Sequence, residues 1–328
     1  MATERTKQQS ELNLWYGARQ NPIEHDDSGL ASNRISEEPG SGMNIAIQGE
    51  PGSFSHEAAL KLVPGASIAP FALSADVFAA VADGSVDAAA IPIENSLAGS
   101  VSEHFDLLLN HDVKVERETL LRIRHNLIAI SGASLGAIDR VFSHPVALAQ
   151  CRKFLAEHPR MEAFAFYDTA GSVKQLVELR DRHAGAIASR AAAEYYGAQI
   201  LAADIEDNPE NFTRFFLIKR SREVEQDPAA NKISIAFSLE NRPGSLVAAL
   251  AAVSALGTNL TKIESRPVHG KPWEYIFYVD CQLRSREEEK LALKALEPHC
   301  SMVKSLGCYR EAEEAGLEDR EQGIGNRE

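Results

Sequence analysis

Short apolar and β-branched runs alternate with alanine- and leucine-rich segments of helical spacing between residues 43 and 220, and this alternation restricts the fold most. It is typical of crossover units, which build a mostly parallel sheet with helices on its faces. The predicted strands are 45–48, 67–71, 88–93, 125–130, 140–143, 163–167, 184–188 and 214–219. The predicted helices are 56–63, 75–83, 101–110, 146–158, 171–182 and 190–196. Because the extended stretch 113–130 is long enough to cross between sheets, we expect two α/β lobes rather than one wide sheet.

Residues 231–309 have a different pattern. Ile233, Ile235 and Phe237 alternate with polar residues, as in a strand of a sheet with one buried face. A helix with an apolar stripe begins at Pro243 and ends at Gly257. The remaining predicted elements are strands at 260–268 and 274–282 around a turn at 269–271, a helix at 285–296 and a strand at 302–309. This βαββαβ order predicts a ferredoxin-like domain, a fold that by itself implies no function.

Three segments lack sustained apolar periodicity. Residues 1–42 are predicted to be disordered, residues 221–231 to form a linker, and residues 311–328 to form a loose acidic tail. The sequence therefore divides into an α/β domain at 43–220 and a smaller domain at 232–310.

The charge of the chain excludes several classes of partner. There are 34 Lys and Arg against 47 Asp and Glu, a formal charge of −13, which has the wrong sign for a nucleic-acid partner. No apolar run approaches the roughly 18 residues that cross a bilayer, and the N-terminal segment resembles neither a signal peptide nor a transit peptide. We expect a cytoplasmic protein. The 4 cysteines show no CxxC pair, which indicates reduced thiols in the core.

Small polar residues recur where predicted strands pass into helices. The positions are 49–55, 94–96, 143–144, 169–172, 189–190 and 211–213. The carboxyl ends of parallel strands meet at one edge, and helix N-termini with free N–H groups suit an anion. At any single position a helix cap explains the same residue. Taken together, the positions favour a small anionic ligand bound between two lobes.

The sequence offers few groups for other chemistry. The histidines show no metal-binding spacing, and no glycine-rich loop ends in Gly-Lys-Ser or Gly-Lys-Thr, so neither a metal nor a nucleotide cofactor is predicted. His144 and Cys151 are separated by about 10 Å on a helix, too far for a base and its nucleophile. The best-placed acidic candidates are Glu50, Glu94 and Asp168, each of which is equally explained as a solvated turn residue.

Several of these segments together resemble a known family. IAIQGEPGSFSHEAA, IPIENSLAGSV, FSHPVALAQC, YDTAGS and NFTRFFLIKR, in this order and spacing, resemble the prephenate dehydratase domain. NRPGSLVAALAAVSALGTNLTKIESRP, followed by WEYIFYVD, resembles an ACT domain. The resemblance covers the chain from Met43 to about Tyr309. It implies two lobes like those of periplasmic binding proteins with the active site between them, no cofactor, and conversion of prephenate to phenylpyruvate, carbon dioxide and water.

The family motifs carry over to this chain residue by residue. The essential threonine of the TRF motif falls on Thr213, and the implied catalytic residues are Thr213, Asn95, Ser143 and Gln150. The implied substrate-binding residues are Ser53, Ser55, Ser96, Thr169, Ser172, Arg214 and Phe215. Val146 stands where family members often have glutamine, so one polar contact to substrate is absent there or is supplied from elsewhere. Because an alcohol is too weak an acid to protonate a leaving group fully, we expect Thr213 to donate a hydrogen bond to it.

The ACT resemblance implies feedback inhibition by phenylalanine. The implied effector residues are Gly244, Ser245, Leu246, Asn259, Leu260, Glu264, Ser265 and Arg266. The start of a helix explains Pro243 and Gly244 equally well, and the GSL and ESRP motifs together favour a site. ACT domains of the family pair edge to edge, so we expect a homodimer or homotetramer. Because the resemblance makes this the regulatory domain, we also expect that removal of residues 231–328 leaves an active, phenylalanine-insensitive enzyme.

Two alternatives stay open at this point. The substrate could be arogenate, which has an amino acid side chain in place of the ketoacid and would give phenylalanine directly. The chain could also be a small-molecule sensor that uses the two-lobed cleft without catalysis, although the intact NFTRF segment disfavours this. Comparison of kcat/KM for the two substrates distinguishes the first alternative, and an assay of prephenate consumption distinguishes the second.

Overall fold

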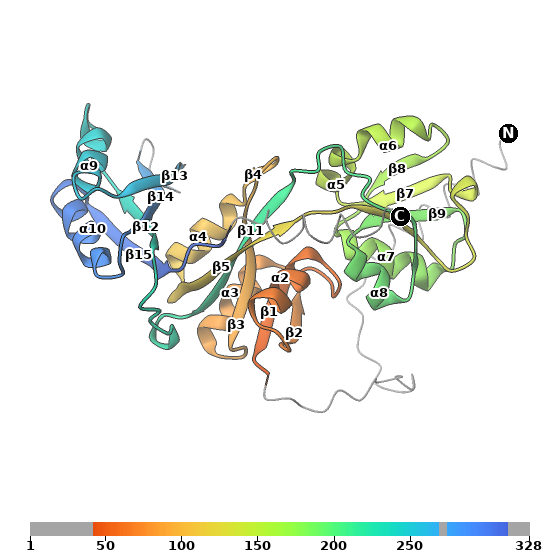
Figure 1. Ribbon diagram of the computed structural model, residues 1–328, viewed down its shortest axis with the longest axis horizontal. Helices are drawn as coiled ribbons and strands as arrows, with labels where there is room; N and C mark the ends of the chain where they lie inside the picture. The colour runs from red at the N-terminus through yellow and green to blue at the C-terminus, as the bar shows by residue number, and fades with distance from the viewer. Residues whose placement is uncertain (1–41, 269–273, 314–328) are drawn as a thin grey trace, which may run out of the picture. The chain divides into compact units, whose positions relative to one another are not determined.

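A computed structural model describes residues 42–268 and 274–313 of the chain. This part contains three sheets, which belong to two α/β lobes and a C-terminal domain (Figure 1). The expectations for residues 1–41, for the turn at 269–271 and for residues 314–328 lie outside the described ranges. Within those ranges no helix is long and apolar enough to span a membrane.

The first lobe is built on a sheet with the strand order β2-β1-β3-β11-β5, in which the short β4 pairs with β3. Its strands are β1 (Asn44–Gln48), β2 (Ser67–Phe71), β3 (Ala88–Asn95), β4 (Gly99–Ser100), β5 (Val113–Arg122) and β11 (Phe212–Arg220). Its helices are α2 (Phe54–Leu62), α3 (Ser74–Asp83) and α4 (Ser102–Asn110). Helix α2 packs on one face, and α3 and α4 pack on the other. Ile45, Ala46 and Ile47 are therefore all fully buried, as in a central parallel strand.

The second lobe is a sheet with the order β10-β6-β9-β7-β8. Its strands are β6 (Asn126–Ala129), β7 (Arg140–Ser143), β8 (Glu162–Ala165), β9 (Ala184–Ala188) and β10 (Gln199–Ala202). Its helices are α5 (Pro145–Gln150), α6 (Arg152–Glu157), α7 (Thr169–Leu179) and α8 (Arg190–Tyr196), with a 3-10 turn at Leu135–Ala137. The chain crosses between the lobes after β5 and returns before β11 (Figure 1). The prediction of two α/β lobes is confirmed.

One predicted helix is interrupted. The prediction of a continuous helix over 146–158 is wrong, because α5 ends at Gln150 and α6 begins at Arg152. The carboxylate of Asp207 accepts the backbone N–H groups of Arg152 and Lys153 at 3.2 and 2.9 Å and caps the second helix. This cap comes from the segment between β10 and β11, far from α6 in the sequence, so no local sequence signal announces it.

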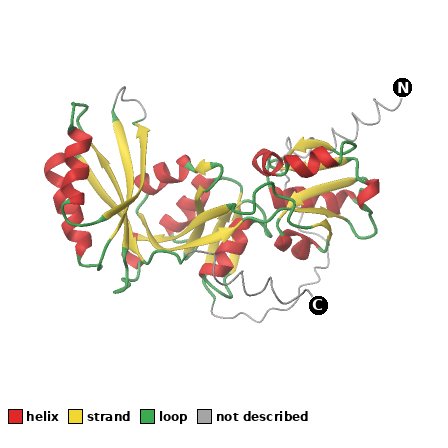
Figure 2. Ribbon diagram, turned by 45° about the horizontal axis from the view of Figure 1, so that its top comes forward, coloured by secondary structure: helices red, strands yellow, loops and turns green. Residues whose placement is uncertain are grey.

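The C-terminal domain has the predicted βαββαβ order. It consists of β12 (Lys232–Ser238), α9 (Ser245–Ser254), β13 (Asn259–Pro267), β14 (Tyr275–Gln282), α10 (Glu288–Leu296), a 3-10 turn at Glu297–His299 and β15 (Met302–Tyr309). The antiparallel sheet has the order β13-β14-β12-β15, and α9 and α10 lie side by side on one face (Figure 2). Ile233, Ile235 and Phe237 point into the core beneath these helices.

The prediction that this sheet has only one buried face is wrong. Ser234, Ala236 and Asp280 point to the face opposite the helices, where they are 1, 0 and 2 % exposed. That face packs on the first lobe: Ala236 and Tyr309 share one hydrophobic cluster with residues of α3, α4 and β11. The alternation of polar residues along β12 therefore marks a domain interface rather than a solvated surface.

Strand β15 approaches β5 closely at a glycine. A Cβ atom on Gly307 would lie 2.3 Å from the carbonyl oxygen of Val115, which is too close for any side chain. The segment after β15 is also held, since Glu311 forms an ion pair with Lys232 and the N–H of Ala312 donates to Glu118 at 2.8 Å. The start of the predicted loose tail is thus part of the interface.

Candidate functional site

A cavity of about 690 Å³ lies between the two lobes. This volume is typical of small-molecule sites, which run from about 300 to 1,000 Å³. Its walls come from the ends of β1, β3 and β11 in the first lobe and from α5 and the start of α7 in the second. Both lobes must be in place to form it, as expected for a ligand bound at the carboxyl ends of strands.

Two helices begin at the cavity wall. Ser53 caps α2, and its hydroxyl accepts the backbone N–H of His56, while Asp168 caps α7 and accepts the N–H of Gly171 at 2.6 Å. The first residues of both helices, Ser55 and Thr169 among them, line the cavity. The N-terminal turn of a helix carries a partial positive charge, so these two helices suit carboxylates of a ligand.

A chain of amide side chains crosses from the second lobe to Thr213. The amide nitrogen of Asn211 donates to Oε1 of Gln150 at 3.0 Å, and its oxygen accepts from Nδ2 of Asn95 at 2.7 Å. Nδ2 of Asn95 also donates to Oγ1 of Thr213 at 2.9 Å. Because an amide nitrogen only donates, the hydroxyl oxygen of Thr213 is an acceptor in this contact, and its own proton is left for a group in the cavity.

Seven of the predicted catalytic and substrate-binding residues line the cavity. They are Ser53, Ser55, Asn95, Gln150, Thr169, Thr213 and Phe215. Val146 also lines it and is 42 % exposed, so the departure from the family pattern lies at the ligand site.

Three predicted serines hold the framework instead. The hydroxyl of Ser143 is fully buried and donates to the carbonyl of Ile187 at 2.5 Å, inside the sheet of the second lobe. Ser172, also fully buried, donates to the carbonyl of Thr169 within its own helix. The hydroxyl of Ser96 bonds the backbone of the segment before β11. None of the three residues lines the cavity, so the catalytic role predicted for Ser143 and the substrate-binding roles predicted for Ser96 and Ser172 find no support in the structure and stay predictions.

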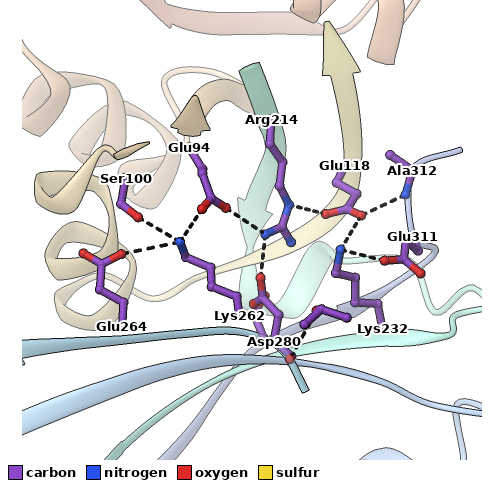
Figure 3. Close-up of polar contacts among 12 residues, drawn as sticks. Glu94, Ser100, Glu118, Arg214, Lys232, Lys262, Glu264, Asp280, Glu311 and Ala312 are labelled. Atoms are coloured by element: carbon purple, nitrogen blue, oxygen red, sulfur yellow. Dashed lines mark hydrogen bonds and ion pairs between the residues drawn. The ribbon is translucent and has the colours of Figure 1, made fainter. Parts of the chain in front are cut away.

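Arg214 lies on the face of the sheet opposite the cavity. Thr213 faces the cavity, so its neighbour along the strand points to the opposite face of the sheet. The guanidinium of Arg214 contacts Glu118 at 2.6 Å and Asp280 of β14 at 2.5 Å (Figure 3). It also donates to the hydroxyl of Tyr309 at 2.9 Å. Arg214 therefore joins the first lobe to the C-terminal domain and does not line the cavity, where the sequence placed it as a substrate-binding residue.

Two acidic residues line the cavity. The hydroxyl of Tyr167 and the ammonium of Lys174 contact the carboxylate of Glu50 at 3.0 and 3.1 Å, which links the lobes. Burial raises the pKa of Asp168 to about 6, and the nearby charge of Glu50 contributes to this shift. Gly49 permits the approach of Asp168, since a Cβ there would lie 2.8 Å from Oδ2.

The raised pKa of Asp168 has a consequence for stability. The folded state binds this proton more tightly than the unfolded chain does, so protonated Asp168 contributes to the free energy of unfolding. This contribution is fully present below pH of about 4 and is lost as the pH rises through about 6. We expect Asp168→Asn, which keeps the helix cap, to remove a stability change on the order of 2 kcal/mol between these pH values. Thermal unfolding of both proteins across this range measures it, and an unchanged pH dependence in the variant would contradict the assignment.

Comparison with known proteins decides the family. The profile of the prephenate dehydratase family matches residues 45–223, and that of the ACT domain matches residues 233–297. The chain belongs to the prephenate dehydratase family. It is 39 % identical over 292 residues to arogenate dehydratase/prephenate dehydratase 2 of Arabidopsis thaliana, with 85 % of this chain and 76 % of the relative covered.

Two solved structures are similar to the dehydratase. One is the prephenate dehydratase of Arthrobacter aurescens in complex with L-Phe, with a TM-score of 0.75 and 32 % identity, covering 82 % of this chain and 90 % of that one. The other is GqqA, described as a novel type of quorum-quenching acylase, also with a TM-score of 0.75 and 32 % identity, covering 83 % of this chain and 98 % of that one.

The predicted effector residues of the dehydratase lie at two places in the ACT domain. Gly244, with φ of +85°, precedes α9, which Ser245 and Leu246 begin. The others lie on β13 at the edge of the sheet; they are Asn259, Leu260, Glu264, Ser265 and Arg266. Two of these are bound to α4 of the first lobe: Glu264 accepts from Ser102 at 3.2 Å, and Arg266 pairs with Asp106 at 2.6 Å.

Sequence reasoning missed several residues of the site. Gln48 and Tyr167 line the cavity but look like ordinary strand-end residues. His125 is 2 % exposed, and its Nε2 contacts Oε1 of Gln150 at 2.9 Å, so it helps to fix the amide chain. The only signal for His125 was its place at the start of a predicted strand. Its relation to Gln150 depends on tertiary structure.

Proposed function

We propose that this dehydratase converts prephenate into phenylpyruvate, carbon dioxide and water. The observation that carries the proposal is the orientation of Thr213, whose hydroxyl accepts from Asn95 and keeps its proton for a ligand. The N-terminal turns of α2 and α7 supply donors for the two carboxylates of prephenate. An overall acidic chain can thus bind a dianion locally.

The reaction breaks two bonds of the substrate. One carboxylate leaves as carbon dioxide, its bonding electrons enter the ring, and the ring hydroxyl departs with its bonding electrons. The departing hydroxide takes up one proton and becomes water, and the new aromatic ring supplies the driving force. We propose that Thr213 donates a hydrogen bond to the departing oxygen, where charge develops, and that water supplies the net proton. The amide chain holds the hydroxyl of Thr213 in place before the reaction begins.

The test of this function is direct. Purified protein should consume prephenate and form phenylpyruvate at a rate that is proportional to enzyme concentration. Absence of turnover in a folded preparation would overturn the proposal. Arogenate is the alternative substrate, since the name of the Arabidopsis relative includes both activities, and kcat/KM for each substrate decides between them.

The geometry disfavours acylase chemistry of the kind named for GqqA. A hydroxyl that attacks an acyl group needs a base that accepts its proton. The partner of Thr213 is the amide nitrogen of Asn95, which is a donor. The same contact that would hinder nucleophilic attack favours donation to a leaving group.

We further propose that phenylalanine inhibits the enzyme through the ACT domain and that two copies pair through β13. That strand is an edge of its sheet, and Leu260 and Ile263 on it are 39 and 45 % exposed. Pairing there would place the expected effector residues between two copies of the chain. The two copies could form a homodimer or be half of a homotetramer. The ACT profile and the L-Phe complex of the Arthrobacter enzyme support this proposal.

Gly244 provides a test of the effector site. No atom beyond its chain neighbours lies within 4 Å of a Cβ placed on it, so a larger side chain projects into open space, while its φ of +85° adds backbone strain to any substitution. We expect Gly244→Val to raise the phenylalanine concentration for half-inhibition by about 10-fold or more. Val247→Ala, at an exposed position of the same helix, serves as the control. Unchanged inhibition in Gly244→Val would place the effector elsewhere.

A further inference from the structure

Lys262 of the ACT domain reaches the wall of the catalytic cavity. It lies on β13, yet its side chain is only 10 % exposed because it extends toward the first lobe. Its ammonium donates to Oε1 of Glu94 at 2.9 Å and to the hydroxyl of Ser100 at 2.8 Å, and it lies 3.5 Å from Glu264 (Figure 3). A regulatory-domain cation is therefore bound directly to two residues of the catalytic domain.

One partner of Lys262 lies in the cavity wall, and the other adjoins it. Ser100 lines the cavity itself. Glu94 directly precedes Asn95, and the pairing of β3 with β11 sets Glu94 opposite Arg214 and Asn95 opposite Thr213. Ser100 in turn pairs with Glu94 through the short β4. The wall between the ACT domain and the catalytic hydroxyl is thus a single sheet, with Lys262 on one side and Thr213 on the other.

We propose that Lys262 is a positioning residue for the dehydratase reaction, an inference that rests on the proposed function. An ammonium has only donors, so the hydroxyl oxygen of Ser100 accepts this contact, which holds the short β4 beside β3 at the edge of the cavity. The bond to Glu94 holds the end of β3, and so fixes Asn95, the residue that orients Thr213. Lys262 acts through these residues and does not touch the reacting atoms.

The same residue connects the effector strand to the cavity. The expected effector residues flank Lys262 on β13, and Glu264 contacts both Lys262 and Ser102 at the start of α4. A ligand that shifts β13 or recruits Glu264 would change the position of the ammonium relative to Glu94 and Ser100. Inhibition would then follow from loss of the positioning contacts, without any long path through the protein.

The central experiment measures kcat, KM and phenylalanine inhibition of Lys262→Met in the full chain. Methionine keeps most of the side-chain volume, and the Glu94 side chain is 36 % exposed and can be solvated when its partner is removed, so we expect the variant to fold. We expect kcat on prephenate to fall by roughly 10- to 100-fold with a smaller change in KM, because misplaced catalytic groups act mainly on the transition state. Phenylalanine inhibition should weaken at least about 5-fold. Lys262→Arg keeps the positive charge and should recover part of the kcat and part of the phenylalanine inhibition.

Lys304→Met is the matched control. Lys304 also reaches from the ACT domain to the first lobe, but it donates to the carbonyls of Leu108, Leu109 and His111 at the end of α4. We expect this variant to keep wild-type kcat and inhibition, whatever its thermal stability. If both variants lose kcat in proportion to their loss of thermal stability, the role of Lys262 is only structural and the proposal is wrong.

Ser100→Ala cuts the same contact from the catalytic side, should Lys262→Met fail to fold. Because the two side chains act as a unit, the double variant should lose less kcat than the product of the single effects. Independent effects, or wild-type kcat and inhibition in Lys262→Met, would overturn the proposal. If the wild-type protein itself does not convert prephenate, the proposed function fails instead, so the two failures are distinguishable.

Discussion

Thr213→Ala is expected to lower kcat on prephenate by about 10²- to 10³-fold, which is the usual cost of removing one preorganised donor from a site of developing charge. The KM should change little, because the hydroxyl matters most as the ring oxygen departs. Steady-state kinetics of the purified variant measure both values. Thr213→Ser keeps the group that accepts from Asn95, and should recover much of the loss.

Ser143→Ala is the matched control for this prediction. It also removes a buried hydroxyl from a sequence-predicted catalytic position, but that hydroxyl bonds the carbonyl of Ile187 away from the cavity. We expect a modest loss of thermal stability with kcat nearly unchanged. Wild-type kcat in Thr213→Ala would exclude the threonine from the mechanism. A large loss of kcat in Ser143→Ala would support the catalytic role that the sequence predicts for Ser143.

Removal of residues 231–328 is expected to unfold the catalytic domain or make it insoluble, in contrast to the expectation from the sequence that the remaining enzyme stays active. Phe216 and Ile218 are fully buried in a cluster that the ACT domain completes with Tyr278 and Tyr309. Each such side chain contributes about 1.5–3 kcal/mol when buried, and a whole domain is stable by only about 5–15 kcal/mol. The truncated chain also loses Asp280 as a partner of the buried Arg214.

Thermal unfolding and sedimentation of the truncated chain measure this effect. Gly307→Val in the full chain tests the same interface independently. The valine side chain would overlap the backbone of Val115 and separate β15 of the ACT domain from β5 of the first lobe. We expect it to lower the melting temperature as well. A truncated chain that stays soluble with wild-type kcat would show that the catalytic domain does not depend on the shared core.

The order of elements was predictable from the sequence because it depends on local periodicity. The alternation of runs before residue 220 and the pattern after residue 231 both indicate their sheets correctly. The short β4 was missed, since two residues carry too little pattern, and β10 was missed although β7, of the same length, was predicted. The contacts of Gln150 with His125 and Asn211 were not predictable, because these residues are far apart in the sequence and meet only in the tertiary structure.

Most of the cavity wall was predictable from motifs, and the errors have a common cause. A motif marks a stretch of neighbouring residues, whereas a strand sends neighbours to opposite faces. The TRF segment thus places Thr213 and Phe215 in the cavity and Arg214 against the ACT domain. Ser143, at the end of β7, and Ser172, inside α7, also lie close in sequence to cavity residues, but their hydroxyls bond the backbone.

The two-faced strand β11 constrains how this protein can change during evolution. Substitutions at Thr213 and Arg214 affect different sites, so each site can in principle vary independently. Insertion or deletion of one residue in β11 affects both sites at once, because a shift of one position exchanges the two faces of the strand along its length. Such a change would turn the guanidinium toward the substrate and the hydroxyl toward Asp280, with simultaneous loss of the active site and the domain interface. Length variation among descendants of this gene should therefore fall in the loops and not in β11.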